Sequence, residues 1–256
     1  MNQQERKEFL LWKAEQYEHP NFIENDPISI PHRFTRKEDI EIIGLIMATI
    51  SWGNRKSIIK SGDKLLTILG ESPYDFVMHF NPEKPLNFVH RTFSGQDLQH
   101  FLLGLRNIYE KDGLEACFNK LPIEGHENRI YNFRTAMLSN LQDLRIQKHL
   151  SNPMSNSACK RLNMFLRWMV RSNTKGVDFG LWNNIPKSEL RLPLDVHTGN
   201  TARHLNLLNR KQNDWKSSEE LYRQCATICP EDPGKLDFAL FGLGAMEKFN
   251  QPSFLL

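Results

Sequence analysis

The sequence predicts an all-α protein, and three observations support this fold class. Apolar residues recur three and four positions apart in most segments, as at Leu98, Phe101, Leu102 and Leu105. No segment shows the sustained alternation of apolar and polar residues that is typical of strands. Residues with the spacing of a helix capping box precede several periodic segments, as at residues 35–38.

The predicted helices follow in order along the chain. The segment that Thr35 caps is apolar almost all round as far as Ile50, so we expect it to be a buried, central helix. Ser94 has the position of a second helix cap. We expect a loop at 25–31, a hairpin-like segment at 150–157 and an irregular connection at 176–191. The expected helices cover residues 5–17, 36–50, 58–69, 95–108, 128–141, 158–171, 195–208, 217–228 and 233–249.

Length and charge set broad limits on domains and partners. A chain of 256 residues forms one large domain or two small ones. We expect a single helical unit with two lobes: lobe A at about 1–35 plus 172–256, and lobe B at about 36–171 with the hairpin at 150–157. The net charge of +3 permits nucleic-acid binding but does not by itself indicate it.

The cysteines and the apolar segments exclude several classes of protein. Cys117, Cys159, Cys225 and Cys229 do not suggest a disulfide framework in so long a chain, and we expect buried thiols and no metal site. The N-terminus lacks the apolar stretch of a signal peptide. The longest apolar segment, at 40–52, is too short to span a bilayer. We therefore expect a cytoplasmic protein with no membrane partner.

The expected helix at 158–171 has two contrasting faces. Leu162, Phe165, Leu166 and Met169 share one face and suit a core. The other face carries a basic stripe with an aromatic residue beside it, which suits binding of a phosphate backbone and an unstacked base. From the helical spacing alone, a solvated charged face is the simpler interpretation. The stripe comprises Lys160, Met164, Arg167 and Arg171, with Arg161 and Trp168 beside it.

Lys160 lies in the first turn of that helix, after Ser157 as the expected N-cap. The helix dipole disfavours an ammonium group at this end, which favours the free amine that a nucleophile needs. The same helix end suits binding of a phosphate. Both roles, nucleophile and phosphate contact, remain open from the sequence.

Asp195 follows Pro193 and Leu194 at the expected start of another helix. Aspartate is among the best N-caps, and this explains the residue without any chemistry. Backbone N–H groups at a helix start also keep a carboxylate ionised. Such an anion stabilises the positive charge that develops on a sugar when an N-glycosidic bond breaks.

The segment Pro193-Leu194-Asp195-Val196-His197 resembles the catalytic segment of the helix–hairpin–helix (HhH-GPD) DNA glycosylases. In bifunctional members a lysine opens the helix after the hairpin, and Lys160 matches that position. The separation, 195 − 160 = 35 residues, looks closer to archaeal 8-oxoguanine glycosylases, with an insertion at 176–191. Residues 40–69 and 236–242 are similar to further helices of the superfamily. Overall, the chain resembles an uncharacterised bacterial family that is distantly related to these enzymes.

Several positions depart from the superfamily pattern. Residues 152–156 replace its glycine-rich hairpin, so DNA would have to be gripped there by side chains. A glutamine of the turn after the buried helix is missing, and Trp52 or Asn54 takes its place. The arginine usually found five residues after the aspartate is Asn200, with Arg203 nearby. No four-cysteine pattern follows, so we expect no iron–sulfur cluster.

The resemblance implies a two-lobed HhH-GPD fold and a base-excision repair glycosylase with AP-lyase activity on a damaged base, such as an oxidised purine. It implies duplex DNA with a damaged base as partner, no cofactor, and a monomer. The alternatives are a non-catalytic nucleic-acid-binding protein on the same fold and a helical interaction protein. The implied site residues are Lys160 and Asp195 for catalysis; Arg161, Arg167, Arg171, Ser155, Ser157 and Asn54 for nucleic-acid binding; and Trp52, Trp168, Trp182 and His197 for the base pocket.

Overall fold

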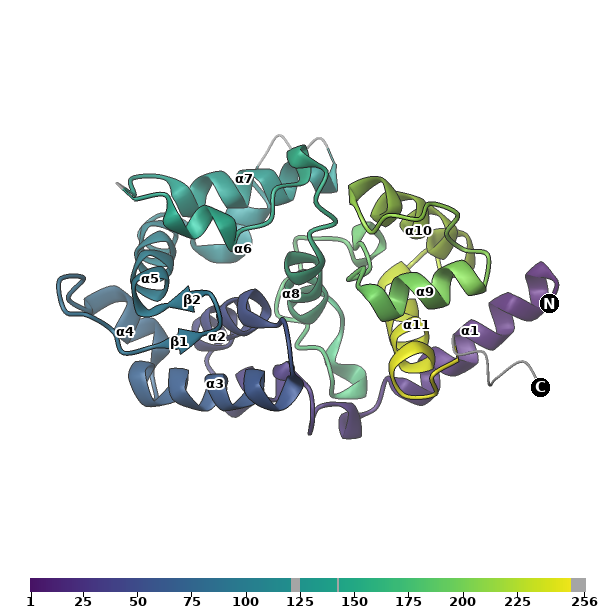
Figure 1. The fold of residues 1–256 in the computed structure, drawn as a ribbon, viewed down its shortest axis with the longest axis horizontal. Coiled ribbons are helices and arrows are strands. Elements are labelled where there is room, and N and C mark those ends of the chain that lie inside the picture. The colour runs from purple at the N-terminus through teal and green to yellow at the C-terminus, as the bar shows by residue number, and fades with distance from the viewer. Residues whose placement is uncertain (121–124, 142, 250–256) are drawn as a thin grey trace. The chain divides into compact units, whose positions relative to one another are not determined.

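The structure is a computed structural model that describes residues 1–120, 125–141 and 143–249. Helices dominate these residues (Figure 1). The strands found among them are β1 (Val89–His90) and β2 (Phe93–Ser94), which pair as a short antiparallel hairpin. The predicted all-α fold class is therefore confirmed, with this hairpin as a small addition.

The chain divides into two compact units. We call Ile23–Met154 the central unit, and Met1–Phe22 with the chain from Ser155 onward the terminal unit. These bounds differ from those of the predicted lobes, mainly because the helix that follows Ser157 belongs to the terminal unit. Its last side chains form ion pairs there with residues such as Glu18 and Asp232.

In the central unit α2 is almost wholly buried, as its apolar sequence predicts. Its N-cap is Arg36 and not Thr35, and no side chain bonds the first turn, so the capping box predicted at Thr35 is wrong. The box at Ser94 is present, because Ser94 and Asp97 bond each other's backbone N–H groups. The helices are α2 (Lys37–Ile50), α3 (Arg55–Leu69), α4 (Pro73–His79), α5 (Gly95–Tyr109), α6 (Gly113–Phe118) and α7 (His126–Leu138), with 3-10 turns at Pro27–Ser29, Pro31–Arg33 and Arg145–Lys148.

The terminal unit contains α1 and the last four α-helices of the described chain. The predicted helix at 233–249 is a 3-10 turn followed by a shorter α-helix, which ends at Ala245. The unit comprises α1 (Gln3–Tyr17), α8 (Lys160–Val170), α9 (Val196–His204), α10 (Trp215–Ile228) and α11 (Leu236–Ala245), with 3-10 turns at Pro20–Phe22, Asn173–Lys175, Lys187–Glu189 and Pro233–Lys235. A further turn, Pro153–Ser155, precedes α8.

Helix α11 lies at the core of the terminal unit, packed against α1 and α9 (Figure 1). Two glycines allow the close approach. A Cβ at Gly242 would lie 2.3 Å from the Tyr17 ring, and one at Gly244 would lie 3.0 Å from the carbonyl oxygen of His197. A larger residue at Gly242 would push α11 away from α1, and one at Gly244 would push it away from the first turns of α9, which follow Asp195.

In the described part of the chain, no helix combines the length and apolar character that crossing a membrane requires.

Candidate lysine–aspartate site

Lys160 and Asp195, 35 residues apart in the sequence, lie next to each other in the terminal unit. Lys160 Nζ is 3.7 Å from Asp195 Oδ2, and the two side chains are 33% and 19% exposed. The pair is therefore partly buried but remains open to solvent. Each residue stands at the start of a helix: Lys160 is the first residue of α8, and Asp195 is the N-cap of α9.

The two oxygens of Asp195 have different partners. Oδ1 accepts a hydrogen bond of 2.9 Å from the backbone N–H of Thr198, so the predicted N-cap is confirmed. Oδ2 faces the ammonium group of Lys160. The carbonyl oxygen of Asp195 accepts a further bond from the Asn213 side chain. These contacts fix the carboxylate, and they leave one oxygen directed at the lysine.

The segment that leads into α8 differs from the predicted one. The N-cap is Cys159 and not Ser157, and Cys159 has a left-handed backbone with a φ of 50°. The Ser157 hydroxyl accepts a bond from the N–H of Cys159, just before the helix begins at Lys160. Asn156 donates to the Asp214 carboxylate, and Ser157 forms a backbone bridge with Asp214. The start of α8 is thus anchored to the start of α10.

The predicted solvent-facing basic stripe on α8 is wrong for Arg167 and Arg171. Both side chains are buried, at 4% and 3% exposure, so they are not available to a phosphate backbone in this structure. The physical reason is pairing with acids from other segments. A guanidinium that is enclosed by carboxylates is better stabilised inside the protein than a helical wheel suggests.

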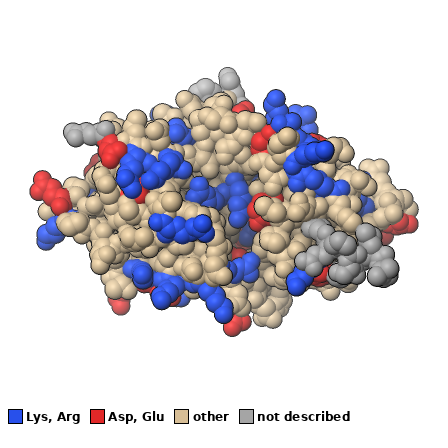
Figure 2. Space-filling model, viewed as in Figure 1, with Lys and Arg blue, Asp and Glu red and all other residues tan. Residues whose placement is uncertain are grey.

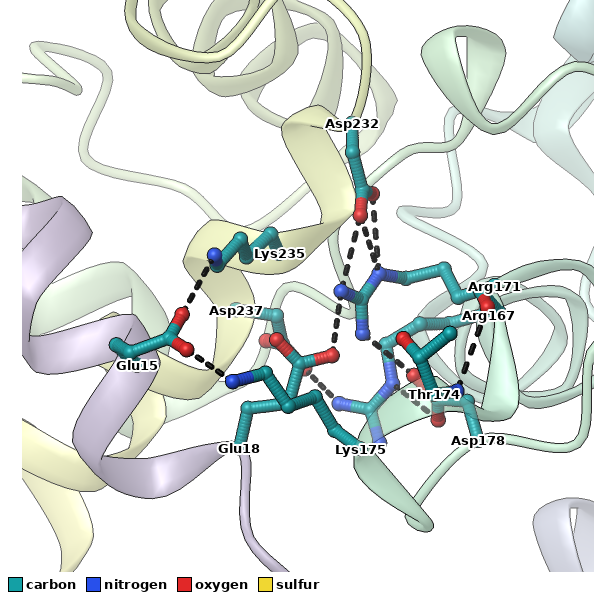
Figure 3. A network of polar contacts seen from close by, with 11 residues as sticks. Glu15, Glu18, Arg167, Arg171, Thr174, Lys175, Asp178, Asp232, Lys235 and Asp237 are labelled. Carbon is teal, nitrogen blue, oxygen red and sulfur yellow. Dashed lines mark hydrogen bonds and ion pairs between the residues drawn. The ribbon is translucent and has the colours of Figure 1, made fainter.

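These ion pairs form a buried network, which we call the arginine seam and which consists of Arg167, Arg171, Glu18, Asp178, Asp232 and Asp237 (Figure 3). Arg167 Nη1 donates to Asp237 Oδ2 at 2.5 Å, and its Nε lies 3.3 Å from Asp178 Oδ1. Arg171 donates to Asp178 and to Glu18, at 2.6 Å each, and its Nε donates to both oxygens of Asp232 at 3.0 Å. The carboxylates hold the pKa of Arg171 above its ordinary value, against the desolvation that would lower it.

Asp237 is a residue that the sequence analysis did not identify. It lies on α11, is 4% exposed, and is held by Arg167. Burial raises its pKa from 3.8 to about 6, an effect that Arg167 opposes and the nearby charge of Asp195 increases. The sequence did contain a signal, because an acid in the otherwise apolar segment Leu236–Gly244 indicates a buried partner.

The aromatic candidates for a base pocket have different surroundings. Trp168 and Trp182 are buried, at 0% and 1% exposure, so their predicted role as stacking platforms is not compatible with this structure. Trp182 packs edge-on against the Phe165 ring, which places it in the core. His197 is exposed and lies edge-on to Phe241 near the start of α9. Trp52, in the central unit, is half-buried and stacks on His149 at a centroid distance of 5.9 Å.

The remaining predicted contacts to nucleic acid lie at several places. Asn54 is the exposed N-cap of α3 in the central unit and bonds the N–H of Ser57. Ser155 is exposed just before α8, whereas Ser157 is half-buried. Arg161 follows Lys160 but is half-buried, and burial lowers the pKa of its guanidinium. Ser155 and Ser157 therefore lie just before the start of α8, and Asn54 belongs to the central unit.

Exposed cations gather on the central unit rather than on α8. Lys56, Lys60 and Lys64 are exposed at every fourth position of α3, which gives this helix a basic ridge. Blue side chains follow α3 in the space-filling view of Figure 2. Within the described ranges, no group of three or more His, Cys, Asp and Glu side chains is arranged to hold a metal ion.

The described residues define a mostly helical protein of two units, with a partly exposed lysine–aspartate pair in the terminal unit. A family model matches residues 26–246, and its description is "Protein of unknown function (DUF2400)". The chain belongs to this family. No curated protein and no solved structure matches the chain.

Proposed function

We propose that this protein is a DNA base-excision repair glycosylase with AP-lyase activity, acting at Lys160 and Asp195. The observation that carries the proposal is the distance of 3.7 Å between Lys160 Nζ and Asp195 Oδ2, in a pair that solvent reaches. An amine and a fixed carboxylate at this spacing are the two groups that covalent cleavage of an N-glycosidic bond requires. The proposal includes an HhH-GPD arrangement of the helices around the pair.

The chemistry begins with a damaged base that is flipped out of the duplex. The free amine of Lys160 attacks C1′ of the sugar, and the bond between C1′ and the base breaks with its electron pair leaving on the base, which takes up the proton that the bound amine loses. Asp195 stabilises the positive charge that develops on the sugar. The C1′–O4′ bond then breaks, O4′ takes its electron pair and a proton from water, and a protonated Schiff base forms between Lys160 and C1′. Loss of a C2′ proton then expels the 3′ phosphate and nicks the strand.

The position of each group suits its role. The Thr198 N–H holds Oδ1 of Asp195, so that Oδ2 stays directed at Lys160. Lys160 begins α8, where the free backbone N–H groups and the helix dipole attract a phosphate. Because Arg167 and Arg171 are buried, the phosphate backbone has to be gripped by other cations.

A non-catalytic nucleic-acid-binding protein is the second candidate function. The basic ridge of Lys56, Lys60 and Lys64 favours it, since phosphate binding by these residues needs no chemistry at Lys160. Half-buried Trp52 precedes α3 and offers an aromatic ring to an unstacked base.

Trapping with borohydride separates the two candidates. Duplex oligonucleotides with an 8-oxoguanine or an abasic site are incubated with the protein, and borohydride reduces any Schiff base to a stable covalent complex. We expect a complex with the wild type, none with Lys160→Gln, and strongly reduced yield with Asp195→Asn. Lys175→Gln, which changes another surface-accessible lysine of the terminal unit, is the matched control and should trap normally.

Two results would contradict the enzyme proposal. Undiminished trapping by Lys160→Gln would exclude Lys160 as the nucleophile. Salt-sensitive DNA binding without trapping and without base release would favour the binding protein, and Lys60→Gln should then weaken binding while Lys160→Gln should not.

A further inference from the structure

The side chain of Asn213 joins two segments of the terminal unit beside the lysine–aspartate pair. Its Nδ2 donates to the carbonyl oxygen of Asp195 at 2.9 Å, and its Oδ1 accepts from Nη2 of Arg203 at 2.6 Å. The amino group and the carbonyl group of the amide both have a partner, so its orientation is fixed. Because Asn213 is exposed, it adds little to the core, and these contacts are what tie it to α9.

The sequence of α9 leaves room for this contact. A Cβ at Gly199 would lie 2.7 Å from Oδ1 of Asn213 and 2.9 Å from Nη1 of Arg203, so a side chain there would displace the amide. Arg203 also holds the connection before α10, because it donates to the backbone carbonyl oxygens of Arg210 and Gln212 at 2.8 and 3.2 Å. One guanidinium thus fixes both the Asn213 amide and the backbone that leads to it.

Asp214, the next residue, anchors the segment that leads into α8. Its Oδ2 accepts from Nδ2 of Asn156 at 3.1 Å, and its backbone pairs with that of Ser157. The N–H of Trp215 donates to the carbonyl oxygen of Asn156 at 3.1 Å. Arg210 Nε donates to both oxygens of the Asp214 carboxylate at 2.9 Å. Residues 156 and 157 are therefore held in place just before α8 begins.

These contacts form a closed ring that includes the lysine–aspartate pair. From Lys160 the chain leads back three residues to Ser157, which pairs with Asp214. The neighbouring Asn213 bonds the backbone of Asp195, whose Oδ2 lies 3.7 Å from Lys160 Nζ. On the α8 side the ring is held by backbone pairing, and on the α9 side it is held by the Asn213 amide.

We propose that Asn213 is a positioning residue of the lysine–aspartate site, which sets the distance between Lys160 and Asp195 by holding the backbone of Asp195 to the segment that anchors the start of α8. This inference rests on the proposed function, since it takes this pair as the reactive site. Asn213 acts on the reaction through Asp195 and not through the reacting atoms. Arg203 acts one step further away, because it orients the amide of Asn213.

Zero-length cross-linking reports on this distance without any enzymatic activity. A carbodiimide adds to a carboxylate to give an acylisourea, and a neighbouring amine attacks the acyl carbon and expels the urea, which leaves an amide. The yield of the amide between Lys160 and Asp195, the site amide, depends on how often the two groups meet. The amide between Lys235 and Glu15, whose charged atoms lie 2.8 Å apart in the same unit, is the reference amide. Mass spectrometry of the digested full-length protein measures both.

Asn213→Ala should lower the yield of the site amide relative to the reference amide. We expect a fall of about fivefold, the factor by which loss of one hydrogen bond typically shifts a local equilibrium. Asn209→Ala is the matched control. It removes another exposed asparagine of the same connection, whose side chain bonds Glu220 at 3.1 Å, and it should leave both yields unchanged.

Gly199→Ala separates positioning from general stability. The added Cβ would displace the Asn213 amide, whereas alanine in place of glycine inside a helix ordinarily stabilises the helix. We expect the site amide to decrease as in Asn213→Ala, with the reference amide unchanged. This variant retains Asn213 itself, so it also provides the test if Asn213→Ala does not fold.

The results separate this inference from the proposed function. The inference is overturned if the yield of the site amide is unchanged in Asn213→Ala, or in Gly199→Ala where the first variant does not fold. It is overturned as well if the reference amide falls in parallel, if Asn209→Ala has the same effect, or if the wild type forms the reference amide but no site amide. None of these results depends on borohydride trapping.

A selective fall of the site amide in a protein that never traps supports the inference and refutes the lyase. Where the wild type does trap, the trapping rate of Asn213→Ala on an abasic duplex should fall by about the same factor as the site amide, with unchanged affinity for that duplex.

Discussion

Two buried aspartates in different units of this protein have opposite acid–base behaviour. Asp97 in the central unit is 0% exposed and has a pKa lowered to about 2. Asp237 in the terminal unit is 4% exposed and has a pKa raised to about 6. Burial alone would raise both values, so burial does not explain the difference.

The surrounding groups explain it. Burial of Asp97 is outweighed by bonds from Arg145 at 2.7 Å and from the backbone and hydroxyl of Ser94, with His149 3.6 Å away. Asp237 has a bond from Arg167, which Asp178 shares, and a second acid nearby in Asp195. Asp97 is an acid among cations, whereas Asp237 belongs to a network with surplus acid. The first arrangement stabilises an anion, and the second raises the pH at which its carboxyl group ionises.

The largest expected effect comes from removing a seam arginine. Arg171→Met leaves Glu18, Asp178 and Asp232 without their shared cation inside the protein. We expect the free energy of unfolding to fall by about 3–5 kcal/mol, measured by urea denaturation. Arg145→Met, the matched change beside Asp97, removes an exposed guanidinium and should cost clearly less. Equal losses would contradict the contrast between the two networks.

Neutralising each aspartate should have unequal effects at neutral pH. Asp97→Asn removes a helix-capping carboxylate and the partner of Arg145, so we expect a loss of about 2 kcal/mol. Asp237→Asn should cost less, because it also relieves repulsion among the seam acids. Thermal and urea unfolding of the two variants side by side measures the difference. A larger loss for Asp237→Asn would show that Arg167 depends on that carboxylate more than on Asp178.

The pH dependence of these two variants should have opposite signs. Because the pKa of Asp97 is lowered, its stabilising contribution is present above its ordinary value of 3.8 and disappears as the pH falls towards about 2. Because that of Asp237 is raised, its contribution is present below 3.8 and disappears as the pH rises through about 6. Between pH 4 and pH 7 the wild type should therefore lose stability relative to Asp237→Asn. Urea denaturation of both proteins at several pH values in this range measures this change. A difference in unfolding free energy that stays constant with pH would contradict the raised pKa of Asp237.

The smallest expected effect is at the surface of the Asp97 cluster. Lys148 Nζ is 3.6 Å from Asp97, but its side chain is 45% exposed. Lys148→Met should change the unfolding free energy by about 0.5 kcal/mol or less, since exposed ion pairs contribute little. A larger loss in urea denaturation would mean that Asp97 depends on the exposed Lys148 as well as on Arg145.

Local signals predicted the helices well but not their ion pairs. The caps at Ser94 and Asp195 depend on residues three positions apart, so the sequence alone was sufficient to predict them. The cap at Thr35 failed because the helix starts one residue later than the pattern indicates, at Lys37.

The candidate site was only partly predictable. Lys160 and Asp195 were paired through a resemblance, not through any periodicity, and the structure does bring them together. The helical spacing of the basic residues on α8 could not show whether they face solvent or are buried, because the partners of Arg171 come from residues 18, 178 and 232. Helical spacing contains no information about such distant partners. The role of the pair in catalysis stays a prediction.

The division of the chain has a consequence for the order in which the protein is made. The central unit is one continuous segment, whereas the terminal unit needs both α1, which precedes the central unit, and α11, which follows it. On the ribosome, α1 emerges before the central unit but has to wait until α11 is synthesised before Leu10 and Ala14 are buried. The central unit can fold in the meantime. The terminal unit, which contains the lysine–aspartate pair, is therefore completed only after α11 has been translated, so a product truncated before α11 would contain a folded central unit and an incomplete terminal unit.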